Sequence, residues 1–249
     1  MITIKNSSEQ QKMRVAGKVI ADAFKFIEPY VKPGVTTAEL DLLLENFIRG
    51  QGARPNFKNL YGFPASACIS VDDEIVHGLP SERVLKEGEI VSIDVGAEVK
   101  GYNSDAARTF AVGEISHAKR KLIEVTRESF FKGIEQARVG KRLGDISHAI
   151  QEYVESYGFG VVRCMTGHGI GRAVHEDPDI PNFGMAGAGP VIKAGYCFAI
   201  EPMVTEGSYK VKFERKNNWD VCKTADGLPS AHYENTILIL SEKIDILTL

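Results

Sequence analysis

Apolar residues recur every three or four positions in the first fifty residues, a spacing typical of amphipathic helices. One such stripe over residues 13–27 predicts a helix that begins near Ser7 and ends before Pro29. A second stripe over residues 40–48 follows the sequence Thr-Thr-Ala-Glu at 36–39, which has the form of a capping box. We therefore expect two helices to open the chain.

Later segments rich in β-branched residues predict strands. The clearest are residues 67–71, 89–99 and 107–112. Helical spacing returns over residues 116–137 and 144–157. Further strand candidates are residues 196–205, 209–213, 220–224 and 234–240. No linker or low-complexity segment divides the chain, so we expect a single catalytic domain of the α+β class over residues 1–249.

The chain is self-similar at a nearly constant offset. Residues 31–34 resemble residues 137–140, and the apolar positions of the helix that follows each segment also match. Residues 86–94 resemble residues 193–201, and both segments end on a carboxylate after an apolar run. Two repeats are too few for a solenoid. They predict a duplicated α+β unit, roughly residues 31–112 and 137–240, whose halves pack about a pseudo-twofold axis.

Composition excludes several classes of protein. The 249 residues are 43% hydrophobic and carry a net charge of −3, which is ordinary for a globular protein and offers no basic surface for general nucleic-acid binding. No segment approaches the roughly 18 apolar residues of a membrane helix, and the polar first ten residues lack a signal-peptide pattern. The four cysteines form no Cys-x-x-Cys pair, which favours free thiols in a reducing cytoplasm.

Four acidic residues adjoin these apolar strands, two in each half of the repeat. Asp94 and Glu201 end apolar runs, Asp105 comes just before a predicted strand, and Glu234 opens another. A carboxylate in such a place faces the cost of desolvation unless it is paired or bound to a cation. Taken singly, each could be satisfied by a salt bridge or by backbone donors. Four brought together would repel one another strongly unless metal ions lay between them.

Histidine favours the metal interpretation. His168 lies in the glycine-rich sequence Gly-His-Gly-Ile-Gly, where glycine permits a close approach of the backbone to a ligand. His175 follows seven residues later. One imidazole with four carboxylates suits two hard or borderline divalent ions such as Mn, Fe(II), Co or Zn. Two ions about 3.5–4 Å apart can share bridging carboxylates and activate a water molecule.

Seven motifs together resemble the shorter, bacterial type of methionine aminopeptidase over nearly the whole chain. They are residues 75–80 (IVHGLP), 93–96 (IDVG), 104–105 (SD), 167–171 (GHGIG), 175–178 (HEDP), 200–203 (IEPM), and 224–227 (TADG) with 230–234 (SAHYE). The resemblance implies the pita-bread fold: a curved antiparallel sheet with helices outside and metals inside. It also implies removal of an N-terminal methionine from nascent proteins and short peptides, with a preference for a small second residue.

The resemblance also implies a site. Five side chains would hold two divalent ions: Asp94, Asp105, His168, Glu201 and Glu234. Asp105 and Glu234 are expected to bridge both ions, and Glu201 to handle the proton of the attacking water. His77 would form a hydrogen bond near the scissile amide nitrogen. His175 would help to stabilise the oxyanion.

An apolar pocket for methionine is expected, with Phe63, Cys68 and Trp219 as its walls, although each of them could instead be ordinary core. The chain also departs from the usual pattern of this family. Ser104 stands where glycine is usual, Ala199 where threonine is usual, and His232 where glutamine is usual. These departures concern groups around the five ligands.

Two other functions are open at this point. A proline-specific peptidase of the same fold is one, although such enzymes commonly carry an additional N-terminal domain. A metal-free binding module on the same scaffold is the other, although such modules typically lose ligands. The basic cluster at Lys210, Lys212, Arg215 and Lys216 is interpreted as a solvated hairpin, with transient ribosome contact as the alternative. We expect a cytoplasmic monomer without membrane or specific nucleic-acid partners.

Overall fold

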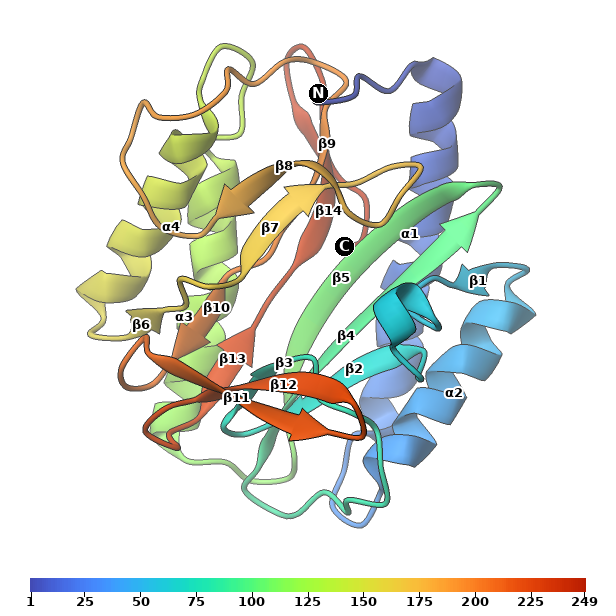
Figure 1. Cartoon of the computed structure of the whole chain (residues 1–249), viewed down its shortest axis with the longest axis vertical. Coiled ribbons are helices and arrows are strands. Elements are labelled where there is room, and N and C mark those ends of the chain that lie inside the picture. Colours follow the sequence, from blue (N-terminus) through green and yellow to red (C-terminus); the bar gives the residue numbers. More distant parts are fainter.

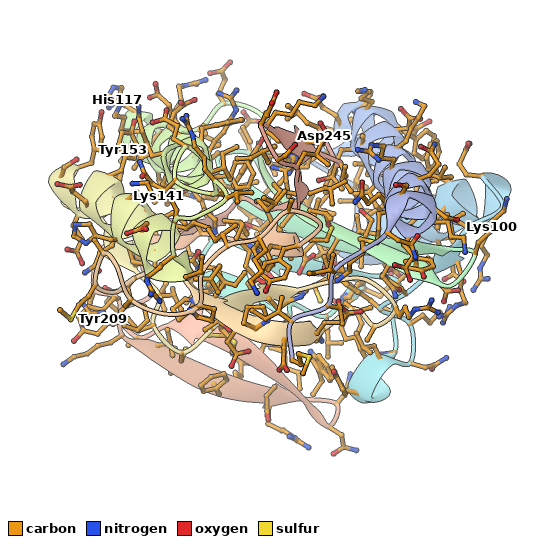
Figure 2. All side chains as sticks on the ribbon, turned by 90° about the horizontal axis from the view of Figure 1, so that it is seen from above. Lys100, His117, Lys141, Tyr153, Tyr209 and Asp245 are labelled. Atoms are coloured by element: carbon orange, nitrogen blue, oxygen red, sulfur yellow. The ribbon has the colours of Figure 1, made fainter.

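Helices cover one side of the molecule and strands form the other. The computed structural model describes residues 1–249 (Figure 1). The helices are α1 (Ser7–Ile27), α2 (Thr37–Gly50), α3 (His117–Ile134) and α4 (Leu143–Ser156), with short 3₁₀ turns η1 (Glu28–Tyr30) and η2 (Leu60–Gly62). Seen from above, the four helices lie along one face, and a two-stranded ribbon lies on the opposite face (Figure 2). No helix is both long enough and apolar enough to cross a membrane.

The first half of the chain forms a four-stranded antiparallel sheet beneath α1 and α2. Its strands are β1 (Arg54–Pro55), β2 (Ala67–Val71), β4 (Ile90–Val99) and β5 (Tyr102–Ala111), and β4 pairs with each of the other three. Apolar side chains on the inner stripe of both helices, including Ile20 and Leu44, are fully buried in one core cluster with Ile93 of β4. The helices therefore cover one face of this sheet, and the opposite face is not covered by them.

The second half repeats this arrangement with α3 and α4. Its main sheet has the order β15-β14-β9-β7-β8. The strands are β7 (Thr166–Gly169), β8 (Glu176–Pro181), β9 (Cys197–Ile200), β14 (Asn235–Ile239) and β15 (Ile244–Ile246). A second core cluster joins Phe130 of α3 and Ile150 of α4 to Phe198 of β9. Each half thus has its own helix pair and its own core.

Two small antiparallel sheets complete the fold. One contains β6 (Gly160–Val161), β10 (Met203–Thr205) and β13 (Ser230–His232). The other contains β3 (Glu74–Val76), β11 (Val211–Lys216) and β12 (Trp219–Thr224). The hairpin of β11 and β12 crosses the front of the molecule, on the side away from the helices (Figure 1). Because β12 also pairs with β3, it ties this front ribbon to the first half.

The two halves share local details that match the sequence repeat. Thr36, at the start of α2, forms an isolated antiparallel bridge with Val84, and Arg142, at the start of α4, forms one with Val191. The amide of Gly34 donates to Leu85 at 2.9 Å, and that of Gly140 donates to Ile192 at 3.1 Å. Each pair of equivalent positions has nearly the same sequence offset. The expected duplicated α+β arrangement is therefore present.

The halves meet where β5 runs beside the start of β14. The hydroxyl oxygen of Thr236 accepts a hydrogen bond from the Asp105 amide at 2.9 Å, and the hydroxyl donates to the Asp105 carbonyl at 2.8 Å. The amide of Glu234 donates to the carbonyl of Ala107 at 3.0 Å. The seam therefore holds Asp105, from the first half, beside Glu234, from the second.

Two sequence predictions about strands were wrong. The single strand expected over residues 196–205 is two strands, β9 and β10, which lie in different sheets. Proline lacks an amide donor, so Pro202 cannot continue the ladder after Glu201. Asp105 lies inside β5 rather than before a strand, because β5 begins at Tyr102 and pairs with β4 along its whole length.

Candidate metal centre

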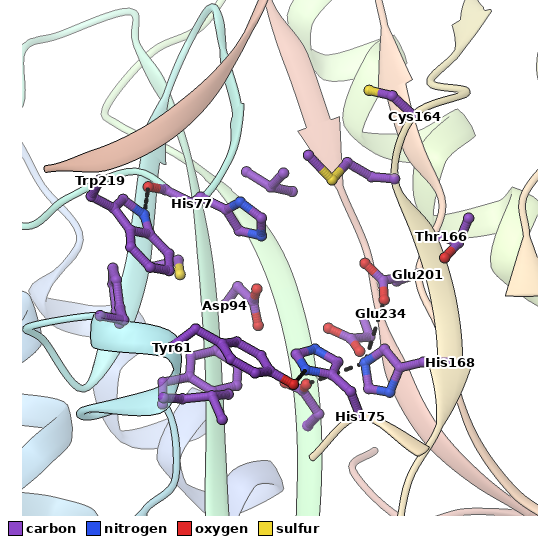
Figure 3. Close-up of a pocket in the computed structure, with 17 residues that line it drawn as sticks. Tyr61, His77, Asp94, Cys164, Thr166, His168, His175, Glu201, Trp219 and Glu234 are labelled. Carbon is purple, nitrogen blue, oxygen red and sulfur yellow. Dashed lines mark hydrogen bonds and ion pairs between the residues drawn. The ribbon is translucent and has the colours of Figure 1, made fainter. Parts of the chain in front are cut away.

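A cavity of about 310 Å³ opens on the inner face where the two halves meet. Its charged and imidazole side chains are His77, Asp94, Asp105, His168, His175, Glu201 and Glu234 (Figure 3). These are all the polar side chains that the sequence singled out as ligands or catalytic groups. Both halves contribute them, so the cavity exists only when the two halves are packed together.

Each carboxylate is positioned by a strand or by a strand end. Asp94 lies in the middle of β4, paired with Ala107 of β5, and Asp105 lies on β5 itself. Glu201 comes directly after β9, where Pro202 ends the ladder. Glu234 lies between β13 and β14. Strand backbones on both sides of the seam thus hold four acidic side chains toward one cavity.

His168 on β7 lies beside two of these acids. Its Nε2 atom is 3.6 Å from Oε1 of Glu201 and 3.8 Å from Oδ2 of Asp105. The possible ligand atoms of Asp105, His168 and Glu234 all lie within 4.8 Å of one another. The other ring nitrogen, Nδ1, is 2.8 Å from the carbonyl oxygen of Gly169 and therefore carries the proton. This tautomer leaves the lone pair of Nε2 directed at the acids, as metal ligation requires.

Burial shapes the electrostatics of the cluster. Desolvation raises the pKa of Asp94 to about 7. Desolvation, followed by the charges of neighbouring carboxylates, raises the pKa of the other three acids well above their usual range: Asp105, Glu201 and Glu234. Desolvation also lowers the pKa of His168 to about 3, so its ring is neutral near pH 7. The site therefore combines a neutral imidazole with four desolvated acids.

Orphaned oxygen atoms show what would fit this cluster. Oδ1 of Asp94, Oδ1 of Asp105 and Oε1 of Glu234 are buried and have no hydrogen-bond donor. Buried carboxylate oxygens are normally paired with donors or cations. The guanidinium of Arg108 lies close to Glu234. It donates to backbone carbonyls, including that of Glu234, and to the side chain of Asn235, and not to the Glu234 carboxylate. Carboxylate and imidazole ligands of this number fit divalent ions.

Two further imidazoles stand at the edge of the cluster. The ring of His175 lies 4.4 Å from that of His168 and stacks on Tyr61 at 5.6 Å. Its Nδ1 atom is 3.3 Å from the hydroxyl of Tyr61. His77 has a left-handed backbone, with φ of 66°, and its carbonyl accepts a hydrogen bond from the indole of Trp219 at 3.1 Å. Both rings face the cavity without joining the group of acids (Figure 3).

An apolar compartment adjoins the acids. Phe63 and Trp219 are in contact, with ring centroids 4.9 Å apart, and Cys68 is buried beside them. All three line the cavity. Desolvation, followed by the charges of Asp94 and other acids, raises the pKa of the Cys68 thiol well above its usual value, so the thiol stays neutral. The three side chains chosen from the sequence thus form one wall.

Sequence reasoning did not select several residues that line the cavity. They are Phe57, Leu60, Tyr61, Val76, Cys164, Met165 and Thr166. Tyr61 is brought over His175 by left-handed backbone conformations at Asn59 and Tyr61 itself. The only signal in the sequence is an aromatic residue next to glycine in a short loop, which is common in ordinary turns.

Comparisons with known proteins agree with the fold. The sequence model of metallopeptidase family M24 matches residues 11–241. The methionine aminopeptidase of Clostridium acetobutylicum is 56% identical over 250 residues, which cover 100% of this chain and 99% of the relative. The crystal structure of methionine aminopeptidase from Thermotoga maritima has a TM-score of 0.97 at 45% identity, covering 100% of this chain and 99% of that one.

The chain therefore belongs to metallopeptidase family M24 and has its pita-bread fold. Within that family it groups with the methionine aminopeptidases, as enzymes of that kind match it along its full length. The Xaa-Pro dipeptidase of Bacillus anthracis is a more distant fold relative, with a TM-score of 0.79 at 26% identity over 98% of this chain and 61% of its own. The alternatives of a proline-specific peptidase and of a binding module are not supported.

Proposed function

We propose that the protein hydrolyses the peptide bond after an N-terminal methionine with the help of two divalent metal ions. The five side chains that would hold these ions are Asp94, Asp105, His168, Glu201 and Glu234. The single observation that carries this proposal is the group of buried acids without donors beside an apolar compartment. Bound ions would balance the acids, polarise the scissile carbonyl and lower the pKa of an attacking water.

Glu201 and the two further histidines have separate roles in the reaction. Glu201 accepts the proton of the attacking water, since its carboxylate faces the cavity and His168. His175 donates to the carbonyl oxygen as negative charge develops there, and such a donor lowers the barrier. His77 forms a hydrogen bond near the scissile amide nitrogen. Desolvation, followed by the charge of His175, lowers the pKa of His77 to about 4, so its ring is neutral and presents one donor and one acceptor.

The apolar wall selects the first residue of the substrate. Phe63, Cys68 and Trp219 enclose space for an unbranched thioether, which packs well against aromatic rings. Tyr61 and His175 stack at the opposite edge and limit the room beside the scissile bond. This crowding supports a preference for substrates whose second residue is small. The proposed substrates are nascent chains and short peptides.

We further propose that the enzyme acts as a cytoplasmic monomer with Co, Mn, Fe(II) or Zn, and that residues 1–249 are one catalytic domain. The split of the ligands between both halves supports a single unit. The basic residues Lys210, Lys212 and Arg215 are exposed on or beside the hairpin of β11 and β12. Their exposure is compatible both with a solvated hairpin and with transient ribosome contact.

A comparison of peptides tests the proposed function. With Mn or Co supplied, Met-Ala-Ser should release its first residue far faster than Leu-Ala-Ser or Ala-Pro-Ser. Trp219→Ala should reduce the preference for methionine over leucine, a discrimination of about 1–3 kcal/mol in such pockets. Phe213→Ala, an exposed aromatic on the same hairpin, serves as the control and should leave the preference unchanged. Faster cleavage of Ala-Pro-Ser than of Met-Ala-Ser would overturn the methionine specificity.

A further inference from the structure

His232 is a buried histidine whose ring has no hydrogen-bond partner. It lies on β13 with 1% of its surface exposed, and neither Nδ1 nor Nε2 forms a hydrogen bond. Its backbone is well fixed, because the amide donates to the hydroxyl oxygen of Thr109 and that hydroxyl donates to the His232 carbonyl, both at 2.9 Å. The ring is therefore held in place by the strand and not by polar contacts of its own.

A neutral imidazole must carry one N–H group, and burial of that group without an acceptor is unfavourable. A position that only needed apolar packing would be filled better by leucine or methionine. The presence of a polar ring at this position indicates a nearby acceptor for its N–H group.

Glu201 offers that acceptor. Its Oε2 atom is 3.8 Å from Nε2 of His232, and its Oε1 atom is 3.6 Å from Nε2 of His168. The carboxylate thus lies between two imidazoles, one on each oxygen. Figure 3 shows Glu201 beside His168, at the edge of the cavity.

The two imidazoles meet this carboxylate in different ways. The Nδ1 proton of His168 is committed to the carbonyl of Gly169, so its Nε2 can only accept or ligate. His232 has no carbonyl on either nitrogen. An ionised carboxylate accepts and does not donate, so it selects the tautomer of His232 that carries the proton on Nε2.

We propose that His232 is a positioning residue whose Nε2–H group donates to Oε2 of Glu201 in the metal-loaded enzyme. The 3.8 Å separation exceeds a usual hydrogen bond by roughly 0.8 Å, a gap that a small rotation of the carboxylate closes. The contact fixes the carboxylate plane and directs Oε1 toward His168. On that side the carboxylate would bind an ion and accept the proton of the attacking water. This role rests on the proposed function, because it acts through the residue that takes the proton.

Two substitutions separate a donor from a merely well-packed side chain. His232→Gln keeps an N–H donor of similar reach, and His232→Leu removes it at similar volume. Met203→Leu is the matched control, because Met203 is fully buried and lies opposite His232 in the β10–β13 register. His232→Met replaces the leucine variant if branching prevents folding, as judged by circular dichroism and thermal unfolding.

The measurements are kcat and KM on Met-Ala-Ser and the binding of Co(II) by calorimetry and visible absorption. Loss of a group that orients a metal ligand typically costs 10- to 100-fold in metal affinity or activity. We expect His232→Leu to lower kcat and Co(II) affinity by about tenfold or more, with KM within about threefold. His232→Gln and Met203→Leu should stay within about threefold of the wild type in all three quantities.

Three outcomes would overturn the proposal. One is a leucine variant with the kcat and Co(II) affinity of the wild type. Another is a glutamine variant as impaired as the leucine variant. The third is a change in the Co(II) absorption bands of both variants, which would make His232 a direct ligand. Failure of the wild type to cleave Met-Ala-Ser would instead contradict the proposed function, while Co(II) binding would still test His232.

Discussion

Asp105 is the acid on which both halves of the molecule converge. It is buried on β5, its backbone is tied to Thr236 of the second half, and its side chain faces His168 and the other acids. Asp105→Asn keeps the shape of the side chain and removes one negative charge. We expect loss of at least one of two metal ions and near-complete loss of activity, because the remaining ligands no longer balance the charge of both ions.

Metal analysis of the purified variant, together with peptide hydrolysis and circular dichroism, checks this expectation. The fold should be retained, since a neutral amide is easier to bury than a carboxylate. Bound metal and activity within twofold of the wild type would remove Asp105 from the site.

His175 should affect catalysis without holding metal. Its ring stacks on Tyr61 and lies beside His168, at the mouth of the group of acids. We expect His175→Ala to lower kcat by roughly a hundredfold or more, the scale for losing one oxyanion donor. The metal content should hardly change. Parallel loss of metal and activity, measured on the same preparation, would identify His175 as a ligand instead.

At the scale of elements, helices were easier to predict from the sequence than the strands that carry the site. All four long helices were predicted to within a few residues of their observed ends, and β2 coincides with its prediction. Periodic apolar stripes identify an amphipathic helix from local sequence alone. In contrast, β7 and β8 were missed, because β7 contains two glycines and β8 contains two prolines, residues that disfavour strands.

The residues of the site also differ in how far the local sequence predicts them. The five proposed ligands were chosen from the sequence because they belong to specific motifs, and the structure brings them to one cavity. Tyr61 was not found, because only the path of its loop places it over His175. His232 was noted as a departure from the usual sequence, but its distance to Glu201 depends on how β13 and the end of β9 are arranged.

The N-terminal arm illustrates how one element supports another. Lys5 is 5% exposed and forms a 2.8 Å ion pair with Glu176, the residue after His175. The other oxygen of Glu176 accepts hydrogen bonds from the amides of Arg172 and Ala173. The arm therefore holds the turn that leads into His175.

Lys5→Met should weaken this support, because it leaves the Glu176 carboxylate without its buried partner. Loss of one member of a buried pair costs about 3–5 kcal/mol. Since Glu176 keeps its backbone donors, we expect the lower end of that range in urea unfolding, with a fall in kcat. Lys18→Met removes an exposed pair with Asp22 on α1 and should change the free energy of unfolding by less than about 1 kcal/mol. Equal effects of the two substitutions would contradict the proposed support.

At the scale of the whole molecule, the proposed metal site is also the junction of the two halves. Asp94 and Asp105 come from the first half, and His168, Glu201 and Glu234 come from the second. Ions bound there would attract both halves, whereas acids without ions repel one another across the junction. Metal content should therefore control global stability as well as activity.

The pH dependence of metal-free protein provides the test. Burial raises the pKa of Asp94 to about 7 and that of Asp105, Glu201 and Glu234 well above their usual range, whereas unfolded acids titrate near 4. Above pH 4 the folded state therefore binds more protons than the unfolded state. By linkage, the free energy of unfolding falls as the pH rises through these pKa values.

Buried histidines have the opposite effect, which fixes the useful pH window. His77, His168 and His232 have pKa values lowered to about 4, 3 and 3 by burial, so their contribution to stability increases as the pH rises to about 6.5 and is constant above 7. Between pH 7.0 and 8.5 the raised acids change the balance. Cys68, Cys197 and Cys222 act in the same direction, because burial raises their thiol pKa values above the roughly 8.5 of an unfolded thiol. We expect EDTA-treated protein to melt at a lower temperature at pH 8.5 than at pH 7.0.

The rise in melting temperature on adding Mn should be larger at pH 8.5, because more ligands are then free of protons. Thermal unfolding of the same preparation with EDTA and with Mn measures both effects, and Asp105→Asn should reduce the difference between the two pH values. A metal-free protein that is equally stable or more stable at pH 8.5 would mean that repulsion among these acids does not determine the stability of the junction.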